Sequence, residues 1–251
     1  MFNKLLLTIT LFFTLISCGK AKSVLFIGNS YTGGCRKALT EVFKNNSPEW
    51  KLQFHTKGGA TLASHLKNPE TKKLITTNKY DFVVLQEQSQ RPALGGEYTK
   101  SFEDSVKSFC KIITKSGATP CLFLTWGRRD GDKRNSHIFP NFKTMQNLLT
   151  RAYEKVAKRH NRLHKVKIIP VGYAFYEINK GNRNKNLFKS LYHEDGTHPG
   201  KNGAFLASCI FWESLTKNST TTIIEPTGIE EKTSKQLKEF AKNAVKKNKF
   251  K

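Results

Sequence analysis

The stretch Val24-Leu25-Phe26-Ile27-Gly28-Asn29-Ser30-Tyr31-Thr32 is the strongest indication of the fold, because an uninterrupted apolar run leads straight into a polar turn. A short apolar run that ends at glycine is typical of a strand buried inside a sheet. A serine at such a turn faces outward while the backbone beside it is held rigidly. Ser30 is therefore the first candidate for a reactive side chain.

Strand-like and helix-like segments alternate along the rest of the 251-residue chain. This alternation predicts a parallel sheet that helices cover on both faces. We expect a three-layer α/β/α sandwich around a central, mostly parallel five-stranded sheet of the flavodoxin-like kind. Functional groups in such folds gather beyond the carboxyl ends of the strands. The expected strands are 23–27, 50–55, 82–85, 121–124 and 166–171, and the expected helices are 35–44, 62–76 (helical or broken), 99–114, 142–160 and 204–215.

A distant segment, Asp195-Gly196-Thr197-His198-Pro199, supplies the groups that a reactive serine needs. A weak nucleophile, a base and a group that orients the base are the requirements of acyl transfer. We predict that Ser30 is the nucleophile, that His198 is its base and that Asp195 orients His198. The α/β-hydrolase fold is not favoured, because its nucleophile turn needs Gly-x-Ser-x-Gly and Thr32 stands at the last position.

The two segments resemble the first and last sequence blocks of the SGNH (GDSL-like) hydrolases. In that family a serine follows the first strand in a Gly-Asp-Ser or Gly-Asn-Ser context, and an Asp-x-x-His motif near the C-terminus completes the triad. Gly28-Asn29-Ser30 matches the first block and Asp195-Gly196-Thr197-His198 the last. The resemblance extends from about Ser23 to Leu215 and implies the same three-layer fold and a serine esterase without a cofactor.

The two middle blocks of the family supply the oxyanion hole. Lys57-Gly58-Gly59-Ala60-Thr61 matches the second block, which implies that the Gly59 N–H lines the hole together with that of Ser30. The family's third block is Gly-x-Asn-Asp, whereas this chain has Leu85-Gln86-Glu87-Gln88-Ser89. A Gln amide offers the same donor on a longer arm, so we expect Gln88, and next Gln86, to donate. The run resembles a variant subgroup with Leu-Gln-x-Gln-Ser as its third block, which implies no particular substrate.

Four further side chains follow predicted strands and are candidates for substrate contacts, with solvated loop residues as the alternative. Guanidinium groups recognise carboxylate or sulfate groups on sugars. A metal site formed by His193, Asp195 and His198 competes with the triad, but its spacing is not diagnostic and a fourth ligand is not evident. We therefore expect no metal. The four candidates are Arg91, Trp126, Arg128 and Arg129.

The first 17 residues resemble a bacterial export signal. The apolar run from Leu5 to Ile16 is too short to span a bilayer, which takes about 20 residues. Leu15-Ile16-Ser17-Cys18 resembles a lipobox, which predicts cleavage before Cys18 and a lipid on its thiol; an ordinary signal peptide is the alternative. We expect a tether over 18–22, a hydrolase domain over 23–217 and a protein anchored in the bacterial cell envelope.

An exported protein meets an oxidising compartment, where cysteines form disulfides. Four cysteines follow Cys18, and the sequence leaves both their pairing and their free, buried state open. The absence of a CxxC pair disfavours a thiolate zinc site. The four are Cys35, Cys110, Cys121 and Cys209.

The formal net charge is +24, which attracts polyanions such as acidic polysaccharide or anionic lipid. Nucleic acid is disfavoured, because the sequence contains no RNP-like or helix-turn-helix pattern. The basic extension 218–251 has eight lysines and a single acid from Lys232 onward, with apolar residues at helical spacing. We expect a helix packed on the domain, with a membrane-surface helix as the alternative. Ser219 to Ile224 is expected to be extended or an edge strand.

These observations predict an exported serine esterase that hydrolyses an acyl ester, above all an O-acetyl group on carbohydrate. The carbohydrate assignment comes from the resemblance and from the expected envelope location. The departure in the third block motivates an alternative from another class, a non-catalytic envelope lipoprotein that binds anionic glycan on the same fold.

Overall fold

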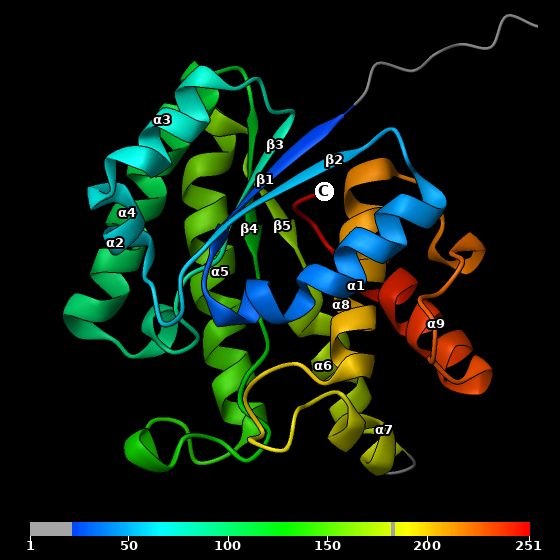
Figure 1. Cartoon of the computed structure of the whole chain (residues 1–251). Helices are drawn as coiled ribbons and strands as arrows, with labels where there is room; N and C mark the ends of the chain where they lie inside the picture. Colours follow the sequence, from blue (N-terminus) through cyan, green and yellow to red (C-terminus); the bar gives the residue numbers. More distant parts are fainter. Residues whose placement is uncertain (1–21, 182–183) are drawn as a thin grey trace, which may run out of the picture.

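The computed structural model describes residues 22–181 and 184–251. Its centre is a sheet of five strands in the order β2-β1-β3-β4-β5, and every neighbouring pair is parallel. The predicted three-layer α/β/α sandwich with a five-stranded parallel sheet is confirmed (Figure 1). The strands are β1 (Ser23–Gly28), β2 (Lys51–Thr56), β3 (Phe82–Leu85), β4 (Thr119–Phe123) and β5 (Lys167–Ile169).

Helices cover both faces of the sheet, as Figure 1 shows. Successive residues of β1 point to opposite faces: Val24 and Phe26 enter one apolar core, and Leu25 and Ile27 enter the other. The first core is closed by α1 (Ser30–Asn46), α6 (Val171–Lys180), α8 (Lys201–Thr216) and α9 (Glu231–Lys247). The second is closed by α2 (Leu62–Lys67), α3 (Pro69–Thr77), α4 (Gly96–Lys115) and α5 (Phe142–His164). The short elements are η1 (Arg91–Ala93), η2 (Lys133–Asn135), α7 (Lys185–Ser190) and η4 (Thr220–Thr222).

The first helix begins at Ser30 and not near residue 35, where the sequence predicted its start. Asn29 caps the helix, since its side-chain oxygen accepts the N–H of Tyr31 at 3.1 Å. Asparagine is among the preferred N-cap residues. Gly33 and Gly34 obscured this start, because glycine disfavours the helix interior. The fifth strand is also shorter than predicted, because Val171 already opens α6.

The expectation that Ser219 to Ile224 is an edge strand is wrong. Residues 220–222 form the short helix η4, whose first turn is capped by the Ser219 side chain. Thr220 also donates its hydroxyl to the Lys238 carbonyl at 2.9 Å, and its N–H binds Glu213 at 2.9 Å. These bonds tie the segment to α8 and α9, so its backbone is not extended along the sheet.

The basic C-terminal segment forms α9, which packs on the domain. Leu237, Ala241 and Ala244 of α9 are buried in the first core. Beyond α9, the Phe250 carbonyl accepts the N–H of Ile168 at 3.0 Å, and Asn248 Nδ2 donates to the Ile168 carbonyl at 2.8 Å. The chain end therefore covers the outer edge of β5, where Figure 1 places its C label.

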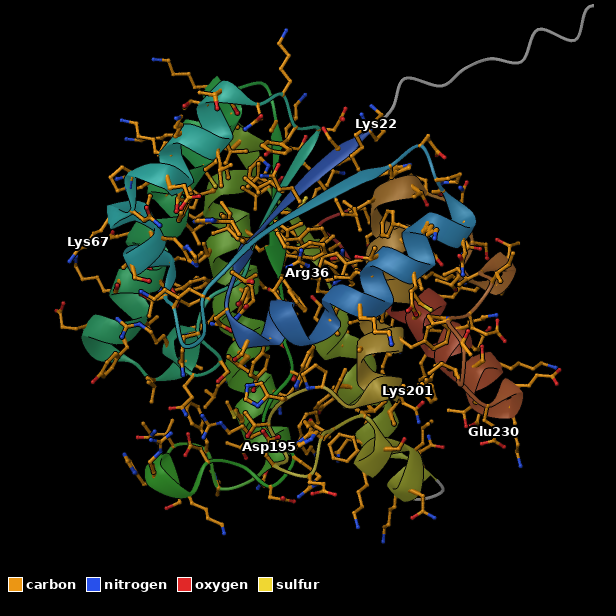
Figure 2. All side chains as sticks on the ribbon, viewed as in Figure 1. Lys22, Arg36, Lys67, Asp195, Lys201 and Glu230 are labelled. Carbon is orange, nitrogen blue, oxygen red and sulfur yellow. The ribbon has the colours of Figure 1, made fainter. Side chains whose placement is uncertain are left out.

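Positive charge is spread over the surface, as the labelled Lys22, Lys67 and Lys201 show on well-separated parts of the molecule (Figure 2). Within 22–181 and 184–251, none of the helices has the length and apolar character needed to cross a bilayer. The predicted signal peptide and Cys18 lie outside the described residues.

The cysteines whose pairing the sequence left open are free thiols. All four are buried, and burial raises the pKa of the Cys35, Cys110 and Cys121 thiols to about 12. Cys209 is buried in the first core as well. The thiols therefore act as small apolar core residues.

Candidate active site

Ser30 lies at the turn between β1 and α1, at the carboxyl edge of the sheet. Asn29 fixes this turn twice: it caps Tyr31, and its Nδ2 donates to the Ala60 carbonyl at 2.9 Å. Ser30 is the first residue of the helix, where backbone N–H groups lack intrahelical acceptors and the helix dipole is positive. The serine thus combines a hydroxyl with a backbone donor suited to a negative charge.

The structure brings Ser30, His198 and Asp195 together although 168 positions separate Ser30 from His198. The Ser30 Oγ lies 2.9 Å from His198 Nε2, and His198 Nδ1 lies 2.6 Å from Asp195 Oδ2. A ring that donates from Nδ1 to the carboxylate presents its Nε2 lone pair to the serine hydroxyl. The side chains of His198 and Asp195 are each 42% exposed, so the site opens directly to solvent.

The Asp195 carboxylate is held by its own loop, which Figure 2 shows below the carboxyl ends of the strands. Its Oδ1 accepts the backbone N–H groups of Thr197 and His198 at 2.8 and 2.9 Å. Gly196 makes this turn possible with a φ of +65°. Partial burial raises the pKa of Asp195, but the bonds from the His198 ring and from these two N–H groups outweigh it and lower the pKa to about 2. The carboxylate is therefore ionised at every ordinary working pH.

Comparisons with known proteins show which solved structures share this fold. Neither a protein-family model nor a curated protein matches the sequence. Among solved structures, a protein from Slackia heliotrinireducens assigned as an SGNH hydrolase is 26% identical, with a TM-score of 0.62 over 77% of this chain and 98% of its own. The chain has the SGNH hydrolase fold.

Two further structures share this fold at lower identity. A DUF4886 family protein from Bacteroides uniformis is 20% identical, with a TM-score of 0.71 over 90% of this chain and 95% of its own. An acetylxylan esterase from Geobacillus stearothermophilus is 18% identical, with a TM-score of 0.57 over 78% of this chain and 94% of its own. The predicted resemblance to SGNH hydrolases is confirmed, while the third-block subgroup remains a prediction.

Gln86, one of the two predicted oxyanion donors of the SGNH site, has a different role. Its Oε1 accepts the Asn29 N–H at 2.8 Å and the Thr32 hydroxyl at 2.9 Å, and its Nε2 donates to the Glu87 carbonyl. The side chain is fully buried beneath the nucleophile turn. Gln86 therefore shapes the turn that presents Ser30, and its assignment as an oxyanion donor is wrong.

Gln88, the other Gln predicted as a donor, binds the backbone of its own turn. Its Oε1 accepts the N–H groups of Gln90 and Arg91 at 2.9 and 3.3 Å, which fixes the orientation of the amide. Among the described residues, the Gln88 Nε2 donates to no other group. Gly59 lies in an exposed loop with a φ of +68°, next to Ala60, which Asn29 binds. The roles of Gln88 and Gly59 as oxyanion donors stay predictions.

Trp126 is not a substrate contact, because it is completely buried. Its ring lies between those of Tyr31 and Phe175, with centroid distances of 4.9 and 4.7 Å. Its Nε1 donates to the Thr197 carbonyl at 3.1 Å. Trp126 thus supports the loop that carries Asp195 and His198. An aromatic residue that follows a strand in the sequence can be part of the core as well as part of a binding site, so the sequence alone did not distinguish the two.

Each of the three candidate arginines has a partner within the protein. Arg128 Nη1 lies 2.9 Å from Oδ2 of the buried Asp132, while the buried Arg128 Nε has no hydrogen-bond partner among the described residues. Arg129 pairs with Asp130 at 2.9 Å, and its guanidinium packs so closely on Gly196 that a Cβ there would lie 3.1 Å from its Nη2. The Arg91 guanidinium lies over the Tyr98 ring, 4.9 Å from the centroid. Their contacts with substrate stay predictions.

Sequence reasoning missed two side chains that brace the nucleophile turn. His65 of α2 is buried and bonds the Gly28 carbonyl through Nε2 at 2.9 Å. Burial lowers the pKa of His65. Glu87 is also fully buried, at the carboxyl end of β3. No local sequence signal marks either residue, since Glu87 stands between Gln86 and Gln88 and His65 follows Ser64. Within the described ranges, His193, Asp195 and His198 form no group that could hold a metal ion.

Proposed function

We propose that this protein is a serine esterase that removes small acyl groups, above all O-acetyl, from carbohydrate. The Ser30–His198–Asp195 chain of hydrogen bonds at 2.9 and 2.6 Å supports the proposal most directly. A serine hydroxyl bonded to an imidazole that a carboxylate orients is the arrangement that acyl transfer requires.

The proposed reaction gives each group a role. Ser30 Oγ attacks the ester carbonyl while His198 Nε2 takes its proton, and Asp195 stabilises the resulting imidazolium. The N–H groups of Ser30 and Gly59 and the Gln88 amide donate hydrogen bonds to the oxyanion. His198 then gives its proton to the departing alcohol oxygen, and a water activated by His198 releases the acyl group as an acid.

The openness of the site favours esters that stand on a polar chain. His198 and Asp195 are each 42% exposed, so an ester on a bulky carbohydrate reaches Ser30 without a channel having to open. Structures of the same fold include an acetylxylan esterase from Geobacillus stearothermophilus and a second acetyl xylan esterase. These observations favour acetylated carbohydrate over long-chain lipid esters.

Hydrolysis of p-nitrophenyl acetate and of acetylated xylo-oligosaccharide by wild type and Ser30→Ala tests the proposal. We expect acetate release by wild type and a loss of at least about 10³-fold in Ser30→Ala. Activity that survives Ser30→Ala would refute the mechanism. A wild-type protein that is inactive on acyl esters but retains sulfated or uronic polysaccharide on a column would instead support the non-catalytic glycan-binding alternative.

We also propose that the protein is exported and anchored in the cell envelope through a lipid on Cys18. The apolar run and lipobox-like sequence at 5–18 support this. Metabolic labelling with an alkyne fatty acid should mark wild type and leave Cys18→Ser unmarked. Equal labelling of the two, or none in either, would refute lipidation at this residue.

A further inference from the structure

We propose that Glu87 is a positioning residue that fixes the two loops carrying the Gly59 and Gln88 oxyanion donors relative to each other. The inference rests on the proposed esterase function. It concerns a side chain that takes no part in the triad and that does not contact the substrate.

Glu87 binds the backbone of both loops at once. Its Oε1 accepts the N–H of Gln88 at 2.6 Å. Both of its carboxylate oxygens also accept the N–H of Leu62, at 3.3 and 3.2 Å. Leu62 opens α2 and follows the Gly58-Gly59-Ala60-Thr61 loop directly. A single carboxylate thus joins the end of the Gly59 loop to the residue that carries the predicted amide donor.

An ionised carboxylate matches the hydrogen-bond donors at this position, although its burial favours the protonated acid. Two backbone N–H groups converge on it, and an ionised carboxylate is a pure acceptor, whereas a protonated acid or an amide also presents a donor. The charged and titratable groups that face it are Arg91 of η1 and Tyr153 of α5. Burial raises the pKa of Glu87 to about 7, although the Gln88 and Leu62 hydrogen bonds and the Arg91 charge act to lower it.

Stability alone does not account for a carboxylate at this place. The side chain is completely buried, and a buried carboxylate costs free energy that an apolar side chain of similar volume avoids. Its hydrogen bonds go to backbone groups at the oxyanion side of the nucleophile turn. The Asn29–Ala60 and His65–Gly28 bonds brace the same loops from the serine side. Oxyanion donors act through their exact placement, so a brace between them affects turnover before it affects binding.

The test compares steady-state hydrolysis of p-nitrophenyl acetate by wild type, Glu87→Gln and a matched control, Glu103→Gln, between pH 5 and 9. Glu103 of α4 pairs with Lys155 and Arg159 of α5 at 2.6 and 2.7 Å. We expect Glu87→Gln to lower kcat by at least about 10-fold at pH 8 with KM changed less than about 3-fold, since full loss of a donor costs about 10²–10³. The wild-type profile should also contain a loss of activity that comes from protonation of Glu87 near pH 7. Glu87→Gln should lack this component but keep the decline at lower pH, because the triad needs an unprotonated base in both proteins.

A second variant removes the donor instead of the acceptor. Leu62 is the first residue of α2, a position that tolerates proline, and Thr61 before it is already extended at φ −103° and ψ 160°. Leu62→Pro therefore deletes the N–H with little change in the backbone, and we expect the same loss of kcat. Because Leu62 is also buried in the second core, Leu62→Ala, which loses the side chain but keeps the N–H, is its control and should keep a higher kcat. This pair of variants decides the question where Glu87→Gln does not fold.

The outcomes separate this inference from the proposed function. An inactive wild type, or activity that survives Ser30→Ala, would refute the esterase itself. An active, Ser30-dependent wild type with Glu87→Gln or Leu62→Pro equal to it in kcat and pH profile would overturn the role of Glu87 and leave the esterase standing. A rise in KM at constant kcat would also overturn it, because that pattern marks lost substrate binding.

Discussion

Gly34, one turn into α1, lies so close to Pro199 that a Cβ atom at Gly34 would stand 2.8 Å from the proline Cγ. Pro199 directly follows His198, and Ser30 begins the same helix as Gly34. Through this close approach, the loop that carries His198 packs directly on α1, the helix that begins with Ser30. The missing side chain at Gly34 is therefore a condition for the 2.9 Å contact between Ser30 and His198.

Gly34→Ala should push the histidine loop away from the serine. We expect kcat for p-nitrophenyl acetate to fall at least about 10-fold, because small displacements of reacting groups are costly. Gly33→Ala is the matched control, since a Cβ at Gly33 meets nothing within 4 Å. It should keep wild-type kcat and raise the unfolding free energy by about 0.5–1 kcal/mol. Equal kcat values for the two variants would contradict the seating of the loop.

Asp195→Asn should lower kcat by about 10²–10⁴-fold, because the ring then loses its charged partner and the preferred tautomer. Asp130→Asn, which removes a carboxylate exposed beside the same site, should change kcat little. Since the pKa of Asp195 is lowered to about 2, its contribution to stability is complete above its ordinary pKa of 3.8 and disappears only as the pH falls through about 2. Urea unfolding of wild type and Asp195→Asn between pH 2 and 7 checks this: the difference in unfolding free energy should stay constant above about pH 4 and shrink below it, and a difference that is already lost at pH 5 would contradict it.

Trp126→Phe distinguishes a supporting side chain from a substrate contact. The variant loses the bond to the Thr197 carbonyl and part of the stack, so we expect a loss of about 1–3 kcal/mol in unfolding free energy and a several-fold lower kcat. Trp212→Phe removes a comparable buried bond, the one to Ser47 at 2.9 Å, remote from the site. It should destabilise the protein while kcat stays at the wild-type value. A higher KM with unchanged kcat in Trp126→Phe would restore the substrate interpretation.

The buried Glu87 predicts how stability changes with pH. Its pKa is raised from 4.5 to about 7, so the stability it contributes is full below about pH 4.5 and is lost as the pH rises through about 7. The unfolding free energy of wild type relative to Glu87→Gln should therefore fall by roughly 3 kcal/mol across that window. Urea unfolding at pH 4.5, 6 and 8 measures this difference. Glu103→Gln should not show this fall. Partial burial raises the pKa of Glu103, but the ion pairs with Lys155 and Arg159 outweigh it and lower the pKa, so its contribution to stability does not decrease as the pH rises. A difference for Glu87→Gln that does not fall with rising pH would show that Glu87 is not held as described.

The sequence was sufficient for the layers of the fold and for the residues that meet at its edge. Apolar strands such as Val24–Ile27 alternate between the two cores, and parallel order follows from the helices between them. Ser30, Asp195 and His198 could be paired because the chemistry of acyl transfer restricts the residue types. Their contact distance was beyond prediction, since it depends on how Pro199 meets α1.

The incorrect predictions share one physical cause. Gln86, Trp126 and the 219–224 segment carry groups that either solvent or the interior can satisfy, and local sequence does not distinguish the two. In each case the polar groups form hydrogen bonds inside the protein. Gln86 binds Asn29 and Thr32, Trp126 binds the Thr197 carbonyl, and Thr220 binds the Lys238 carbonyl. The cysteines followed the same rule, since each lies inside an apolar core.

The hydrogen bonds that Phe250 and Asn248 make with Ile168 have a practical consequence for work with this protein. An uncovered border strand offers its peptide groups to any other chain, and such borders lead to self-association. Truncation after Lys247, or a purification tag that pulls the last residues away, would uncover β5 in this way. Soluble aggregates in such preparations would then indicate that the edge of β5 has been exposed. A tag placed elsewhere would avoid this.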